Sequence, residues 1–163
     1  MRLKIIFTLL IVFTLVAVAS AQTKISGTAQ CGKPEPQYAI QVGDRPNHSF
    51  AISQSKCPYT KPSEIAGTQT KEFVTTTFSE TSGSRATTRS FVGGTMANGD
   101  KFQVRSQGSA SVKEGAIESA EGTWSFVGGT GKLKGIKGKG TYKGKGGPEG
   151  ITYEIEGEYE LPK

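Results

Sequence analysis

The sequence predicts an all-β fold, namely a single closed antiparallel β-barrel of about eight strands. Glycine makes up 22 of the 163 residues, well above ordinary usage, and runs of good helix formers are nearly absent after the N-terminal segment. Short segments that alternate between apolar and polar residues recur along the chain, as expected of strands with one buried face. Turn-forming residues separate these segments. Together these features are typical of a β-barrel.

The first 21 residues have the features of a secretory signal peptide. Two basic residues precede an apolar run, 5–18, which ends at the small-residue site Ala19-Ser20-Ala21. We expect cleavage after Ala21, which leaves 22–163 as one β-barrel domain. The apolar run is short for a membrane span and no second one follows it. We therefore expect a secreted or periplasmic protein with no membrane span after signal cleavage.

The alternating segments give about eight or nine candidate strands. Asn98-Gly99 lies between two of them and suits a type I′ hairpin turn, because both residues tolerate positive φ. The segment Gly146-Gly147-Pro148-Glu149-Gly150 cannot continue a ladder, so we expect a second hairpin whose flanking strands pair directly. The candidate strands are 24–30, 37–42, 49–55, 68–79, 85–96, 101–112, 117–127, 133–145 and 151–161.

The last two candidate strands carry complementary charges. Lysines alternate with glycines in the first, and glutamates alternate with apolar residues in the second. Any register that matches the apolar faces places lysine opposite glutamate, so a cross-strand salt-bridge ladder is favoured over a nucleic-acid or phosphate patch. We expect no nucleic-acid partner. Glycines on the inward face indicate a tight interior or the close approach of another wall. The charged residues are Lys137, Lys139, Lys143, Lys145, Glu154, Glu156, Glu158 and Glu160.

Cys31 and Cys57 are the only cysteines of the chain. In an exported protein an even pair usually forms a disulfide, and we predict one here. A loop of this length would stabilise the fold by about 3–4 kcal/mol in the chain-entropy account. The alternative is a pair of buried free thiols. We expect no metal site, because His48 is the only imidazole that could join them, and the sequence indicates no cofactor.

His48 follows Asp44 and Arg45 at the start of a candidate strand. An acid–base role would follow if the chain folded these residues into a pocket. A solitary surface histidine is the more ordinary interpretation, because no serine or cysteine carries a nucleophile motif. The glycine-rich run also matches neither standard phosphate-binding fingerprint. We therefore assign no catalytic residue.

Four charged residues alternate in step with large apolar side chains, which would place them on the inward face. Glu72 shares a face with Val74 and Phe78 in this scheme, and Glu118 shares one with Trp124. Arg85 and Arg89 share a face with Phe91. A buried Glu and Arg set could fix a polar ligand group or transfer a proton. A β-bulge that turns each charged group to solvent is the more ordinary alternative. The predicted ligand-binding residues are Glu72, Arg89, Glu118 and Trp124.

The segment Trp124-Ser125-Phe126, followed by 127–133 and by 135–138, resembles the glycine-rich signature of allene oxide cyclase and dirigent-like β-barrels. Leu133 stands where these families commonly have an aromatic residue, and their catalytic residues match no position here. The resemblance implies an eight-stranded antiparallel barrel with an axial cavity. In these features the chain is similar to small uncharacterised secreted bacterial proteins of that shape. The resemblance also implies a possible homo-oligomer.

Three functions remain open on the sequence alone. The first is a binding module that holds a small apolar molecule in a cavity lined by aromatic residues, including Trp124. The second is an isomerase or cyclase-type enzyme with an inward Glu and Arg pair. The third is a non-catalytic envelope or matrix protein that self-associates through its outer faces. The sequence does not decide whether the chain is an enzyme.

Overall fold

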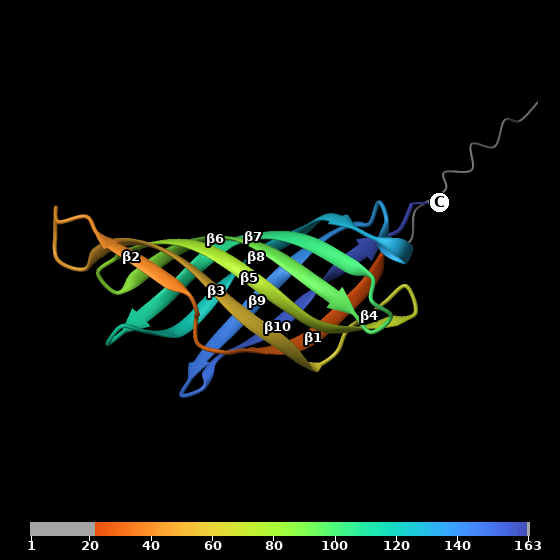
Figure 1. Cartoon of the computed structure of the whole chain (residues 1–163), viewed down its shortest axis with the longest axis horizontal. Helices are drawn as coiled ribbons and strands as arrows, with labels where there is room; N and C mark the ends of the chain where they lie inside the picture. Colours follow the sequence, from red (N-terminus) through yellow and green to blue (C-terminus); the bar gives the residue numbers. More distant parts are fainter. Residues whose placement is uncertain (1–21, 163) are drawn as a thin grey trace, which may run out of the picture.

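Eight antiparallel strands close into a barrel, which confirms the predicted fold class (Figure 1). The computed structural model describes residues 22–162, so the predicted signal peptide and its cleavage site lie outside the described residues. The elements are β1 (Thr23–Cys31), β2 (Gln37–Gln41), β3 (His48–Lys61), β4 (Glu64–Ile65), β5 (Thr68–Ser82), β6 (Arg85–Met96), β7 (Lys101–Lys113), β8 (Ala116–Gly129), a 3-10 turn η1 (Gly131–Leu133), β9 (Lys137–Gly147) and β10 (Gly150–Glu160).

The barrel wall runs in the order β3-β1-β10-β9-β8-β7-β6-β5, and pairing of β5 with β3 closes the ring. Two short strands lie outside this ring, with β2 on the edge of β3 and β4 beside β5. The predicted strand at 37–42 is therefore real but does not belong to the barrel wall. In the part of the chain that the structure describes, no helix is long and apolar enough to cross a membrane.

Both predicted hairpins form. Gly147 pairs with Gly150, so Pro148 and Glu149 make the tight connection between β9 and β10. The β6–β7 hairpin differs from the prediction in its turn type, because only Gly99 of the Asn98-Gly99 pair has positive φ. Gly99 N–H donates to the Met96 carbonyl at 3.0 Å, and Met96 N–H donates to the Asp100 carbonyl at 2.8 Å. The loop therefore has three residues, 97–99, instead of the two of a type I′ turn.

The register of β9 against β10 matches the charge pattern. Lys143 lies opposite Glu154, Lys139 opposite Glu158, and Lys137 opposite Glu160, as predicted. None of these pairs is among the close ion pairs of the described residues. The charged residues therefore keep this face of the two strands toward solvent and match the register, while direct ion pairs between them contribute little to stability.

Trp124 lies flat against two glycines inside the barrel. It is opposite Gly140 on β9, which is opposite Gly157 on β10. A Cβ atom at either glycine would clash with Trp124 Cζ2. The indole Nε1–H donates to the carbonyl oxygens of Thr141 at 3.1 Å and Glu156 at 3.2 Å. The ring can lie against the wall only because these two positions have no side chain.

Tyr142 makes the corresponding contact in the opposite direction around the barrel. Its row across the sheet continues through Gly122 on β8 and Gly108 on β7 to Thr88 on β6. A Cβ atom at either glycine would clash with the Tyr142 hydroxyl oxygen. The predicted close approach at inward glycines is thus confirmed, and the groups that approach are aromatic rings.

The seam between β1 and β3 has the shortest ladder of the ring. Only Thr28 with Lys61 and Ala29 with Tyr59 are paired across it, whereas other neighbouring strands pair over seven or more positions. The predicted disulfide lies beside this seam. Cys31 and Cys57 are both buried, and their Cα atoms are 4.0 Å apart.

This disulfide joins residues 26 positions apart in sequence and supplements the short ladder with a covalent link. The chain-entropy account gives a stabilisation of about 3–4 kcal/mol for such a loop. The alternative of two free thiols is excluded, since the structure has no free cysteine among its described residues.

Replacement of Gly157 by alanine tests the flat packing of Trp124. We expect Gly157→Ala to lower the free energy of unfolding by about 1–3 kcal/mol, because the new methyl overpacks the interior. It should also shift the emission of Trp124, the only tryptophan, to longer wavelength. Urea denaturation and fluorescence spectra measure the two effects.

Gly93→Ala is the matched control, because Gly93 is a strand glycine whose added Cβ would meet nothing within 4 Å. Equal stability and equal emission for Gly157→Ala and the wild type would contradict the packing described for Trp124.

Candidate functional site

Two of the predicted ligand-binding residues lie on the outer wall, which corrects the prediction that they face inward. Glu72 forms an ion pair with Lys56, with Nζ 3.2 Å from Oε2. Arg89 is exposed and lies opposite Phe78, itself 49% exposed. The prediction failed because it took Val74, Phe78 and Phe91 as markers of the interior, and these three residues face outward.

The other two predicted residues have different outcomes. Glu118 is exposed, beside a register shift between β7 and β8, so the bulge alternative holds for this residue. Trp124 faces the interior and is 7% exposed. Its role as a ligand contact stays a prediction. The proposed inward pair of a carboxylate and an arginine does not form.

The interior side chains of the barrel are uncharged. On β3, β5, β6 and β7 the inward positions are mostly serine, threonine and alanine, and many of them are only half-buried. Tyr142 and Tyr153 lie across from this wall with their rings in edge-to-face contact at 5.6 Å. Burial raises the pKa of Tyr153 to about 12, so its phenol stays neutral at ordinary pH. The interior therefore offers hydroxyl groups and aromatic rings without charge.

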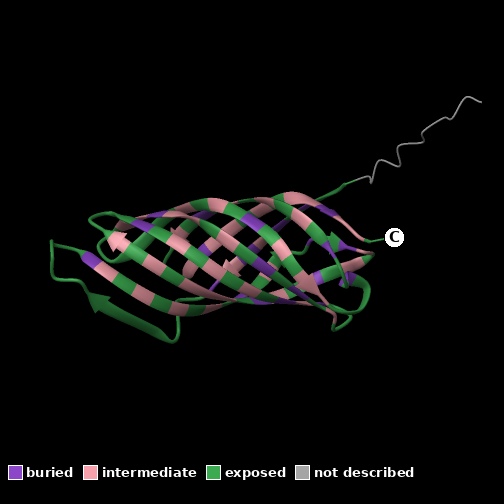
Figure 2. Cartoon of the chain, turned by 90° about the horizontal axis from the view of Figure 1, so that it is seen from above, coloured by how far each residue is buried: buried purple, intermediate pink, exposed green. Residues whose placement is uncertain are grey.

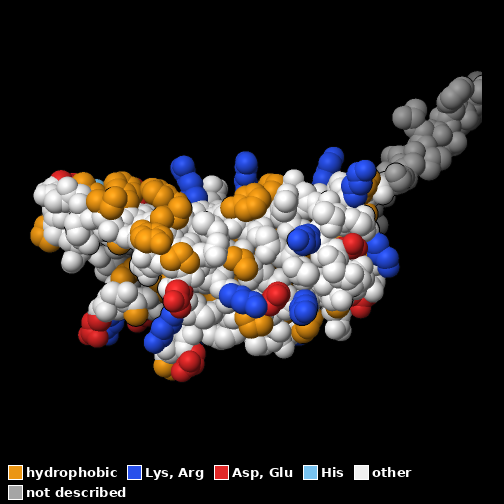
Figure 3. Space-filling model, in the orientation of Figure 1, with side chains coloured by type: hydrophobic (Ala, Val, Ile, Leu, Met, Phe, Trp, Pro, Cys, Tyr) orange, Lys and Arg blue, Asp and Glu red, His pale blue; other side chains and the backbone are white. Residues whose placement is uncertain are grey.

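The outer wall carries several large apolar side chains, in addition to those buried in the core. Ile52 lies opposite Phe78 across β3 and β5, and Phe91 is a diagonal neighbour on β6. These three residues are 47–50% exposed. Figure 3 shows apolar side chains gathered at the end of the molecule where Figure 1 places β2, β3, β5 and β6. Such a cluster on an outer wall is a candidate binding surface.

Two arginines border this cluster. Arg89 lies directly between Phe78 and Gln107, and Arg105 lies directly between Phe91 and Ser125. No carboxylate is directly opposite either guanidinium, and neither is among the close ion pairs of the described residues. On the other side of the barrel Glu158 separates Lys24 from Lys139, so charge there is compensated.

We name the five residues of this surface the arginine platform: Ile52, Phe78, Arg89, Phe91 and Arg105. An open hollow of about 1370 Å³ is lined by these five residues together with residues of the other barrel strands, among them Glu156 and Glu158 of β10, so it is not confined to this surface. The surface combines exposed apolar area with two arginines that have no directly opposing carboxylate, which suits a molecule with an apolar body and an anionic group.

No known protein-family model matches this chain, and no curated protein is significantly similar to it. The site is therefore interpreted from its own geometry.

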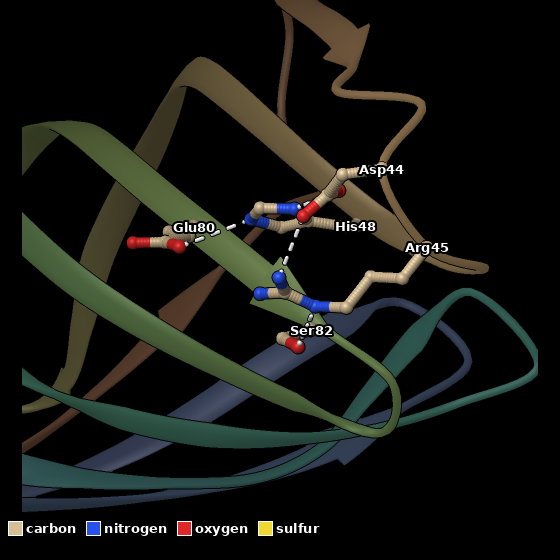
Figure 4. A network of polar contacts seen from close by, with 5 residues as sticks. All are labelled: Asp44, Arg45, His48, Glu80 and Ser82. Atoms are coloured by element: carbon tan, nitrogen blue, oxygen red, sulfur yellow. Dashed lines mark hydrogen bonds and ion pairs between the residues drawn. The ribbon is translucent and has the colours of Figure 1, made fainter.

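His48 is a second polar centre, and its environment corrects the interpretation as a solitary surface residue. It is 6% exposed and lies beneath the loop that joins β2 to β3. Nδ1 bonds Asp44 Oδ1, and Nε2 bonds Glu80 Oε1 at 3.1 Å (Figure 4). Both partners are carboxylates, so the ring satisfies both when it carries both protons.

Arg45 completes this network. Its Nη1 lies 2.7 Å from Asp44 Oδ2, and its Nε–H donates to the Ser82 hydroxyl at 3.1 Å (Figure 4). Both histidine nitrogens are occupied, and the serine hydroxyl bonds arginine instead of histidine. The arrangement thus lacks the nucleophile–base contact of a hydrolase triad. It fixes the β2–β3 loop to β5.

The two bonded carboxylates raise the pKa of His48 above 6.5, with the Asp44 hydrogen bond as the largest cause. The hydrogen bond from His48 lowers the pKa of Asp44 below 3.8. The His48 contribution to stability is therefore complete below pH 6.5 and is lost as pH rises through the raised pKa. The Asp44 contribution is present above pH 3.8 and is lost as pH falls through the lowered pKa.

Titration of His48 by proton NMR tests this network, and it is unambiguous because the chain has one histidine. We expect a midpoint above 6.5 that moves down in Glu80→Gln, since that change removes one bonded carboxylate. Glu121→Gln, an exposed carboxylate on β8, is the control and should leave the midpoint unchanged. A titration midpoint at or below 6.5 in the wild type would rule out the hydrogen bonds of His48 to the two carboxylates.

Proposed function

We propose that this protein is a non-catalytic binding module that holds a small amphipathic anion on its outer wall. The observation that carries the proposal is the arginine platform, where Arg89 and Arg105 lie opposite exposed phenylalanines and have no opposing carboxylate. The apolar body of the ligand would cover Ile52, Phe78 and Phe91, while its anionic group would meet the guanidiniums.

The binding free energy that this surface can supply corresponds to a modest affinity. The three apolar side chains keep only about half of their area exposed, so covering them contributes roughly 2–4 kcal/mol in total. An exposed ion pair adds roughly 0.2–1 kcal/mol for each arginine. These sums suit a transiently bound ligand or a carrier more than a tightly held cofactor.

The setting of this function is also part of the proposal. We propose that the chain is exported to an oxidising compartment, either the periplasm or the medium. The buried disulfide supports this placement, because such bonds persist outside the reducing cytosol. The barrel shape supports a distant relation to the allene oxide cyclase and dirigent-like barrels, on the resemblance of the segment from Trp124 to Gly138. No catalytic residue of those families comes with it.

A second candidate is the interior, which would hold a neutral molecule. It is supported by the half-buried inward hydroxyl groups and by the neutral phenol of Tyr153. The interior has no charged side chain for an anion, so the two candidates differ in the charge of the ligand. A third role, as an envelope or matrix protein, would use the outer face for assembly.

Calorimetry with octanoate and 1-octanol tests the proposal, because the two probes differ mainly in charge. We expect octanoate to bind more tightly than octanol. Arg89→Gln and Arg105→Gln should each weaken octanoate binding by about two- to fivefold, the effect of one exposed ion pair. These exposed residues should not change the thermal midpoint.

Arg85→Gln is the matched control, because Arg85 is an exposed arginine on the same strand whose guanidinium bonds Ser109 away from the platform. Equal loss of octanoate affinity in this variant would reject the platform and leave only a general charge effect. Octanol binding as tight as octanoate binding, with no effect of the arginine variants, would favour the interior instead.

A further inference from the structure

The strand β2 has a free edge. It pairs with β3 on one side, and no other described strand pairs with it (Figure 1). All five of its residues are exposed, and it projects beside the barrel in Figure 2. β1 ends at Cys31, opposite Ile151 of β10, and β2 lies beyond that end. No described barrel strand therefore pairs with the second edge of β2.

The backbone pattern shows which groups lie at the free edge. Val42 N–H bonds the His48 carbonyl at 2.9 Å, and Gln54 N–H bonds the Pro36 carbonyl at 3.0 Å. In an antiparallel ladder the residues that bond a given neighbour alternate, so Tyr38 and Ile40 bond β3. The amides and carbonyls of the intervening residues point away from β3. These residues are Gln37, Ala39 and Gln41.

Within β2 itself, this edge lacks the charges, prolines and bulges that usually keep sheet edges single. The five residues of β2 include no charge and no proline, and the β2–β3 register is regular. Tyr38 is 67% exposed and Ile40 is 74% exposed, both on the outer face. Exposed edges of monomeric proteins are usually blunted by lysine, proline or a bulge. An unblunted edge of this kind favours pairing with another strand.

We propose that β2 pairs with β2 of a second copy of this chain, antiparallel and centred on Ala39. In this register Ala39 faces its own equivalent, and Gln37 faces Gln41 of the other copy. The three residues with edge-facing backbone groups are then all bonded across the interface. Tyr38 and Ile40 of one copy lie beside Ile40 and Tyr38 of the other on the same outer face.

The occupant is a second copy because Tyr38 and Ile40 then meet each other's equivalents on one outer face, with no charge on either strand. One segment supplies both sides of the pair with apolar residues on one face, as a two-fold interface requires. The row that runs from Phe78 through Ile52 to Tyr38 would then continue into the second barrel. The dimer extends the outer apolar surface without covering either arginine, and it does not depend on the proposed ligand.

Sedimentation velocity of the mature chain over a wide concentration range tests this pairing. We expect a reversible dimer in the wild type. Ala39→Pro removes an edge-facing N–H that β3 does not use, and it should raise the dissociation constant by at least about tenfold, given the value of lost edge hydrogen bonds. Ile40→Lys should do the same by placing a charge beside Tyr38 of the other copy.

Ile117→Lys is the matched control, because Ile117 is an exposed apolar residue on β8, remote from β2. It should remain dimeric. Circular dichroism and the His48 titration show that each variant is folded. A wild type that stays monomeric at the highest concentration would overturn the proposal, and so would a dimer that both β2 variants leave intact. Capture of an added extended peptide by a monomeric wild type would assign the edge to another partner.

Discussion

The packing of flat aromatic rings over inward glycines determines the rest of this barrel. An eight-stranded barrel has an interior just wide enough for side chains to fill. Trp124 extends across Gly140 and Gly157 in one direction, and Tyr142 extends across Gly122 and Gly108 in the other. The strands that face them carry small hydroxyl side chains inward. Several large apolar residues of β3, β5 and β6, namely Ile52, Phe78 and Phe91, lie on the outer wall, where they are available for binding.

Three features of the outer surface lie on the same strands. The His48 network holds the β2–β3 loop against β5, and the arginine platform occupies the outer faces of β3, β5, β6 and β7. The free edge of β2 continues the row that includes Ile52 and Phe78. The His48 network holds β2 in place, which would favour both ligand contact and strand pairing, because less of the chain must become ordered on binding.

The sequence predicted the barrel well and the site poorly, for one physical reason. Strand periodicity, the two hairpins and the disulfide follow from local patterns, and all of them are present. The inward face of β5 was assigned from Val74 and Phe78, although those residues share their face with Glu72 and Glu80. The opposite face, which includes Thr75 and Thr77, has no charge. On β5 absence of charge marks the interior better than large apolar residues do, because such residues lie on both faces of this strand.

Other features needed contacts that the sequence does not show. His48 and Glu80 are 32 positions apart, so their bond depends on the β3–β5 register. The outward cluster of Ile52, Phe78 and Phe91 likewise depends on the registers of three strands. The segment around β2 has the alternation of a strand, but only closure of the barrel without it shows that its second edge is free.

The most direct test of this account is NMR mapping of octanoate on the isotope-labelled mature protein, because the indole N–H of Trp124 reports on the interior and the Nε–H groups of Arg89 and Arg105 report on the outer wall. The account predicts that octanoate shifts the two arginine signals and the amides of Phe78 and Phe91, and leaves the indole signal in place. A shift of the Trp124 indole with unchanged arginine signals would contradict it, since the ligand would then lie inside the barrel.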